Sequence, residues 1–227
     1  IRPLINIAIF GCLRYLTNRQ AGFADNFLNV SAGIVFWQLL STAIGDISNS
    51  LTANSNILTK VYFPKLILPA SSLLVCLVDF LIAFVLFLIM FVALKGIPSW
   101  HIVFLPLVIG YGLTFSFAIG LIFATASVKY RDVKFMIPFI LQILFYASPV
   151  FLSSEFVLGL NVPEWLKVVY QSNPFVFILN AFKYCFYGNF ESFDFTYAFV
   201  SLILTVFTLL LSIRYFLNFE KSFADHI

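Results

Sequence analysis

The chain has 227 residues, of which 62% are hydrophobic and 10% are charged, and its formal net charge is +3. An average soluble protein has about 25% charged residues, and a soluble fold of this length could not bury so much apolar surface. The composition therefore excludes a soluble domain and favours an all-α polytopic membrane protein. The small and scattered positive charge gives no reason to expect a nucleic-acid partner.

Apolar runs suited to membrane helices, which need roughly 20 residues to cross a core of ~30 Å, recur along the chain. The first expected span, 2–17, contains an uncharged run of only 11 residues between its arginines. We expect that this helix begins before Ile1; the alternative is that Arg14 reaches the interface with its long side chain. Five further spans are expected at about 26–53, 66–94, 101–128, 135–152 and 195–213.

A short amphipathic segment follows the second expected span. Asparagine and serine at 54–56 can cap a helix, and Pro64 ends it. The apolar residues between them form one stripe of a helix over 55–64: Ile57, Leu58, Val61 and Tyr62. Lys60, within this segment, and Lys65, just after Pro64, mark the segment as cytoplasmic.

Two features stand out inside the third and fourth expected spans. Asp79 is an acid in mid-membrane, where an unpaired charge would cost several kcal/mol. We expect it to be hydrogen-bonded to a neighbouring helix, and not to relay protons, because no basic residue lies at matching depth. In the fourth span small residues recur every four positions, which predicts a close approach by another helix: Gly112, Ser116, Gly120 and Ala124.

The fifth expected span has a basic loop before it and polar residues within it. Lys129, Arg131, Asp132 and Lys134 precede the uncharged run 135–152, which Pro138 and Pro149 should kink. Phe139, Gln142 and Tyr146 fall on one helical face, which we expect to look towards protein or water. We expect Phe135 to lie on the opposite face.

Residues 153–190 are too polar and too broken to span a membrane. The uncharged part between Lys167 and Lys183 has only 15 residues, and Asn173-Pro174 interrupts it. This predicts a re-entrant or interfacial helical hairpin on the outer side. Six spans place both ends in the cytoplasm, and the basic loops 60–65 and 129–134 favour this orientation.

The sequence Tyr130-Arg131-Asp132, the kinked helix with Gln142, then Ser148-Pro149-Val150 and Asn173-Pro174 resemble one family. It is the membrane subunit of type-2 ABC exporters, in particular permeases for O-antigen, capsule or teichoic-acid polymers. The resemblance covers nearly the whole chain, 2–219, which we expect to be a single transmembrane domain.

The resemblance implies a permease, not an enzyme, that moves a lipid-linked polysaccharide or polyol phosphate across the cytoplasmic (inner) membrane of a bacterium. ATP and magnesium would be bound by two copies of an ABC ATPase subunit, because no glycine here opens a G-x-x-x-x-G-K-S/T loop. Other expected partners are a second copy of this chain, the lipid-linked glycan and membrane lipid. No cofactor is expected in this chain, and its separated cysteines and histidines indicate no metal site.

The resemblance also assigns roles to individual residues. Coupling to the ATPase is expected from the segment at 55–64 and the loop before the fifth span: Ile57, Leu58, Lys60, Val61, Tyr62, Arg131 and Asp132. Aromatic rings and an amide that could hold sugars weakly are expected to line the substrate path: Phe36, Trp37, Phe139, Gln142, Phe145 and Tyr146. An outer gate is expected at Ser148, Pro149, Asn173 and Pro174.

Three other functions remain open from the residues. An ABC permease for drugs or small lipids would use the same scaffold, since fold does not decide cargo. An ion-coupled secondary transporter should show internal repeats and paired intramembrane charges, which we do not find. A membrane-embedded transferase would need clusters of acids or histidines at the interface, and these are absent from the sequence.

Overall fold

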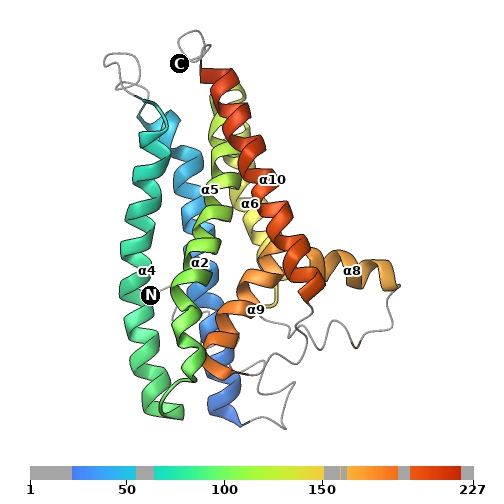
Figure 1. The fold of residues 1–227 in the computed structure, drawn as a ribbon. Helices are drawn as coiled ribbons and strands as arrows, with labels where there is room; N and C mark the ends of the chain where they lie inside the picture. The colour runs from blue at the N-terminus through green and yellow to red at the C-terminus, as the bar shows by residue number, and fades with distance from the viewer. Residues whose placement is uncertain (1–21, 55–63, 151–158, 160–162, 189–194, 221–227) are drawn as a thin grey trace.

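The structure is a computed structural model that describes residues 22–54, 64–150, 159, 163–188 and 195–220. Within these ranges the chain is helical and contains no strand. The long elements are α2 (Phe23–Ala53), α4 (Ile67–Lys95), α5 (Leu105–Lys129) and α10 (Phe195–Glu220). The shorter ones are the 3-10 helix η1 (Trp100–Phe104), α6 (Val133–Ala147), α8 (Glu164–Ser172) and α9 (Pro174–Tyr187). Figure 1 shows the long helices side by side and α8 projecting sideways from them.

Four of the described helices are long and apolar enough to cross a membrane: α2, α4, α5 with η1 in front of it, and α10. The 29 residues of α4 alone extend roughly 44 Å, which exceeds the ~30 Å hydrocarbon core. The chain is therefore a multi-pass membrane protein. The count of six spans stays a prediction, because α6 is shorter and the expected first span, 2–17, lies outside the described residues.

The fifth expected span ends earlier than the sequence indicates. It was expected to run to Leu152, but α6 stops at Ala147 after 15 residues, or roughly 22 Å. The next residue, Ser148, is extended, with φ −97° and ψ 159°. The cause is Pro149, whose ring disfavours a helical conformation for the residue before it. Helix α6 therefore reaches only part of the way along the bundle.

Two helices occupy the described part of the expected outer hairpin. Helix α8 ends at Ser172, and α9 begins at Pro174, so the chain breaks at Asn173 as expected. Asn173 caps α9 by accepting a hydrogen bond from the backbone N–H of Phe175 at 3.0 Å. One face of α9 is buried against α2 and α5, whereas α8 has no buried residue. The re-entrant character of this hairpin stays a prediction.

Helix α2 is the centre of the bundle and packs along both α4 and α5. Its Phe36 stacks on Phe182 of α9, with ring centroids 4.3 Å apart. The small residues of α5 face it: a Cβ at Gly112 would lie 3.1 Å from Phe36 and from Leu40. The predicted close helix contact is thus confirmed, and it lies within the chain, between α5 and α2.

A hydroxyl cluster joins α10 to α5. The Tyr111 hydroxyl lies 2.8 Å from the hydroxyl oxygen of Ser201 and 2.8 Å from that of Thr205. Ser201 and Thr205 are both buried, so these hydrogen bonds are made away from solvent. Inter-helix hydrogen bonds of this kind add about 0.6 kcal/mol each on average in membrane proteins.

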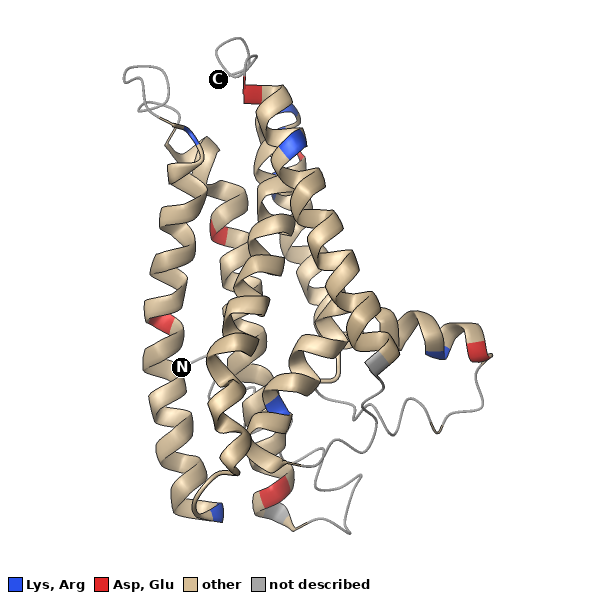
Figure 2. Cartoon of the chain, viewed as in Figure 1, with Lys and Arg blue, Asp and Glu red and all other residues tan. Residues whose placement is uncertain are grey.

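The two ends of the bundle carry most of its charge (Figure 2). Helix α4 begins at one end of the bundle, and α5 and α10 end there; we call this end the basic end. Its described cations are Lys65, Lys129, Arg131, Lys134 and Arg214. The Lys65 amine donates a hydrogen bond to the backbone carbonyl of Glu220 at 3.1 Å, which ties α4 to α10 there. At the opposite end Lys95 forms an ion pair with Asp25 at 2.6 Å.

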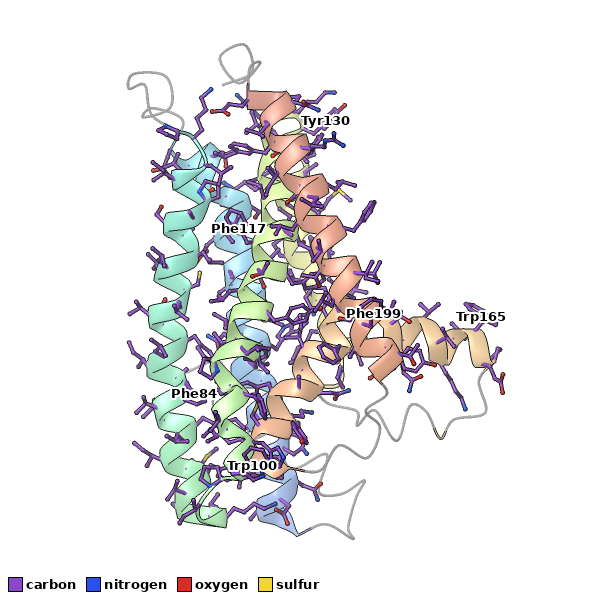
Figure 3. The ribbon with its side chains drawn as sticks, viewed as in Figure 1. Phe84, Trp100, Phe117, Tyr130, Trp165 and Phe199 are labelled. Atoms are coloured by element: carbon purple, nitrogen blue, oxygen red, sulfur yellow. The ribbon has the colours of Figure 1, made fainter. Side chains whose placement is uncertain are left out.

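Aromatic residues lie at both of these ends. Tyr130 lies at the basic end and Trp100 near the opposite end (Figure 3), and both are exposed. Tryptophan and tyrosine favour the two membrane interfaces because their rings have an apolar body and a polar group. The bundle is therefore oriented with its long axis across the membrane.

Candidate functional site

The exposed face of α6 holds the expected path residues together. Phe139 is 68% exposed and Tyr146 is 59% exposed, and Gln142 is exposed between them. The spacing of these residues keeps them on one side of the helix, while Ile137 on the other side is buried. Phe135 is exposed on the same face, so its expected position on the opposite face was wrong: positions 135, 139, 142 and 146 share one side of a helix.

An aromatic contact joins α6 to the central helix. The rings of Phe145 and Trp37 lie 5.7 Å apart, and Trp37 also lies 5.6 Å from Phe175 of α9. Phe145 packs edge to face with Tyr146, at 5.4 Å between centroids. The contact therefore packs α6 against Trp37 of α2, which also contacts α9, while the face with Phe139, Gln142 and Tyr146 stays exposed.

The two path residues expected on α2 lie inside the protomer. Phe36 is 0% exposed and Trp37 is 7% exposed. Phe36 lies between α4 and α9, since it meets Phe80 edge to face and stacks on Phe182. Both side chains pack within the chain in this structure, and their contact with a cargo stays a prediction.

A polar stripe on α2 was missed by the sequence reasoning. Gln38, Thr42 and Asp46 are exposed and recur every four residues, so they line one side of an otherwise buried helix. The stripe runs between α4 and α6: Cys76 of α4 donates from Sγ to Asp46 Oδ2 at 3.2 Å, and Trp37 beside Gln38 meets Phe145. The four-residue period of polar residues in this apolar span is the signal that could have revealed it.

The intramembrane acid of α4 is placed differently from the expectation. Asp79 is exposed and makes no hydrogen bond with the described residues, so the predicted bond to a neighbouring helix is absent there. It lies one turn beyond Cys76, on the side of α4 that borders the α2 stripe. The part of the chain that the structure describes contains no group of three or more potential metal ligands.

The expected outer-gate residues lie in two places, Ser148 and Pro149 just beyond α6 and Asn173 and Pro174 at the start of α9. Ser148 donates its hydroxyl to the carbonyl of Phe145 at 2.8 Å, which closes the last turn of α6. The amine of Lys183, on α9, donates to the carbonyl of Pro149 at 2.5 Å. Asn173 and the buried Pro174 start α9 itself. Pro149 therefore contacts α9 at Lys183, nine residues after Pro174, and the joint action of the four residues as a gate stays a prediction.

The expected coupling residues are partly described. Arg131 and Asp132 are exposed in the turn between α5 and α6, at the basic end. The other five, Ile57, Leu58, Lys60, Val61 and Tyr62, lie outside the described residues, which resume at Pro64. Helix α2 ends and α4 begins at the basic end (Figure 1), so residues 54 and 64 flank the undescribed segment on the same end as Arg131.

Comparison with known proteins finds one family and several relatives. The profile of the family described as "ABC-2 type transporter" matches residues 1–187. A protein of Myxococcus xanthus named "O-antigen export system permease protein RfbA" is 28% identical over 190 residues, which cover 83% of this chain and 71% of that protein. Two proteins of Klebsiella pneumoniae with the same name are each 24% identical, over 77% and 72% of this chain and 66% and 61% of their own lengths. The chain thus spans about two thirds of the length of these relatives.

Proposed function

Because this chain belongs to the ABC-2 type transporter family, we propose that it is the permease of an exporter that moves a lipid-linked polysaccharide or polyol phosphate across the membrane. The relatives named as O-antigen export permeases support a polymer as the cargo.

The observation that carries this proposal is the exposed face of α6. Phe139, Gln142 and Tyr146 lie side by side on a helix whose other side is partly buried, with Ile137 buried. Lipid tails offer no partner to the amide of Gln142, so this face suits a polar passage better than lipid. Flat rings with one amide offer many weak contacts to sugar rings and no strong one, so a polymer can slide past.

The polar stripe of α2 extends this surface. Gln38 and Thr42 present an amide and a hydroxyl next to the contact between Trp37 and Phe145. We propose that the stripe and the α6 face together line one half of the path, and that a second copy of this chain supplies the other half. A path formed in this way has hydrogen-bonding groups on α2 and apolar rings on α6, which matches the two kinds of surface on a sugar.

In this proposal the ATPase subunits bind at the basic end. Two copies of an ABC ATPase subunit would dock there, against residues 55–64 and the exposed Arg131 and Asp132. The concentration of lysine and arginine at this end supports a cytoplasmic orientation in the inner membrane. Residues 153–190 would then lie on the outer side.

The test is export by variants of the α6 face. Gln142→Ala and Tyr146→Ala should each lower polymer at the cell surface at least several-fold in cells that lack their own permease. The permease should still co-purify with its ATPase, because the basic end is unchanged, and ATP hydrolysis should appear only with that ATPase present. Phe207→Ala, an exposed aromatic on α10, serves as the matched control and should export normally.

Three outcomes would contradict the proposal. Normal surface polymer in both alanine variants would remove the α6 face from the path. Loss of drug or small-lipid export, with polymer unchanged, would instead assign the permease to the smaller cargo. ATP hydrolysis by the purified permease alone, above that of mock preparations, would contradict the division of labour between subunits.

A further inference from the structure

Three elements distant in sequence meet at the end of α6. The amine of Lys183, from α9, donates a hydrogen bond to the carbonyl oxygen of Pro149 at 2.5 Å. Gly33 of α2 lies against the same point: a Cβ there would be 3.2 Å from Val150 Cα and 3.3 Å from Lys183 Cε. Pro149 and Val150 are buried. Lys183 thus joins α9 to the last residues of the α6 segment, with α2 underneath.

The backbone just beyond α6 explains why a lysine suits this position. Helix α6 ends at Ala147 and Ser148 is extended, so the Pro149 carbonyl lies outside the hydrogen-bond pattern of the helix. Pro149 is buried, and a buried carbonyl without a donor costs free energy. The Lys183 amine supplies that donor from α9.

This junction lies within the bundle and not at its rim. Gly33 is ten residues from Phe23 (33 − 23), which is roughly 15 Å from the start of α2. Figure 2 shows few charged residues between the two ends of the bundle. An ionisable side chain at such a depth is costly to keep there, and so it marks a functional position.

We propose that Lys183 is a positioning residue that holds the outer end of α6 against α9 and keeps the outer side of the path closed at rest. This inference rests on the proposed function, since α6 is the helix assigned to the path. Breaking the hydrogen bond between the Lys183 amine and the Pro149 carbonyl removes a direct connection between the α6 end and α9. The covalent chain and the Trp37–Phe145 contact keep the rest of α6 in place.

The expected outer-gate residues acquire defined parts in this arrangement. Ser148 closes the last turn of α6, and Asn173 closes the first turn of α9, each by a bond within its own segment. Those bonds stay intact when the two helices separate. The Lys183 bond is different because it connects the two helices.

The experiment measures how exposed the α6 end is. Val150→Cys is introduced into the full chain after its native cysteines are replaced by serine, and the protein is placed in lipid nanodiscs, where a charged maleimide reaches both sides. With Lys183 present, labelling should be slow because residue 150 is buried. With Lys183→Met, which keeps the length of the side chain but cannot donate, labelling should become about tenfold faster, as expected for loss of a charged hydrogen bond. Lys183→Arg should restore slow labelling.

The outcomes separate this inference from the proposed function. Equal labelling rates in the protein with Lys183 and in Lys183→Met would overturn the inference. Equally fast labelling in Lys183→Met and Lys183→Arg would also overturn it, because packing alone would then explain the burial of residue 150. If the methionine variant does not fold, Lys183→Gln decides, because its shorter, uncharged side chain is a weaker donor to the Pro149 carbonyl: faster labelling supports the inference and unchanged labelling overturns it. Labelling involves no cargo, so an error in the assigned polymer leaves the result standing.

Discussion

At the scale of single residues, the glycines of α5 differ in what they face. A Cβ at Gly120 would lie 2.8 Å from both Cβ and Cγ2 of Ile47, closer than such atoms approach in real structures. Ile47 is fully buried and on the central helix, so it cannot swing aside. Gly110, ten residues earlier on the same helix, has nothing within 4 Å of the equivalent point. The packing of α5 on α2 therefore requires glycine at position 120 but not at position 110.

We predict that Gly120→Ala destabilises the protein by about 1–3 kcal/mol, the usual penalty for overfilling a packed contact, and that Gly120→Leu prevents stable folding. Gly110→Ala is the matched control and should be neutral or slightly stabilising, since alanine favours helix more than glycine does. Thermal unfolding in detergent measures both variants. Equal midpoints for Gly120→Ala and Gly110→Ala would show that α5 and α2 do not pack as closely as described.

At the scale of elements, helix α2 combines a packed side with a polar side. Ile44 and Ile47 are buried towards α5, whereas Gln38, Thr42 and Asp46 are exposed between α4 and α6. The hydroxyl of Thr42 donates to the backbone carbonyl of Gln38 at 2.7 Å, so one polar group of the stripe has its hydrogen-bond partner within α2. Such a stripe is stable in a membrane only when water, cargo or another polar surface covers it.

Cysteine scanning along α2 tests whether this stripe is wet. In membranes that hold the cysteine-free protein, a water-soluble maleimide should label Gln38→Cys and Thr42→Cys. Matched cysteines at Leu40 and Ile44 should stay unlabelled because both positions are buried. The expected pattern repeats every four residues. Uniform labelling, or none at 38 and 42, would show that the stripe does not border water.

At the scale of the whole molecule, the two ends differ in charge and in what they present. The basic end holds the α5–α6 turn with Arg131 and Asp132, together with the Lys65–Glu220 bond. At the opposite end the Lys95 amine pairs with Asp25 and also lies 4.3 Å from the centroid of the Tyr187 ring. An excess of lysine and arginine in short loops marks the cytoplasmic side, so the basic end should face the cytoplasm.

This orientation predicts the sidedness of labelling in intact cells. A reagent that cannot cross the membrane should label Trp100→Cys from outside, and should label Arg131→Cys only after the cells are opened. Val85→Cys is the control: it is exposed on the middle of α4, where lipid should shield it in both conditions. Labelling of Arg131→Cys in intact cells would invert the topology and remove the coupling role from the α5–α6 turn.

The long helices could be predicted from the sequence, because a bilayer core demands apolar runs of a fixed length. The spans expected at 66–94 and 101–128 agree within a residue with α4 and with η1 plus α5. The face shared by Phe139, Gln142 and Tyr146 follows from helical spacing alone. The small-residue pattern of α5 likewise predicted a close contact, because nothing else fits between two backbones that approach so closely.

Tertiary structure decided which side of each helix is open, because hydrophobicity marks both lipid-facing and buried positions alike in a membrane protein. Phe36 and Trp37 were therefore expected in the path, although α4, α6 and α9 cover them. The polar stripe of α2, which begins at the next residue, Gln38, was missed. Asp79 was expected to be bonded to a neighbouring helix but is exposed. The contact between Lys183 and Pro149 joins residues 34 positions apart, so no local pattern could reveal it, and only the fold brings the end of α6 to α9.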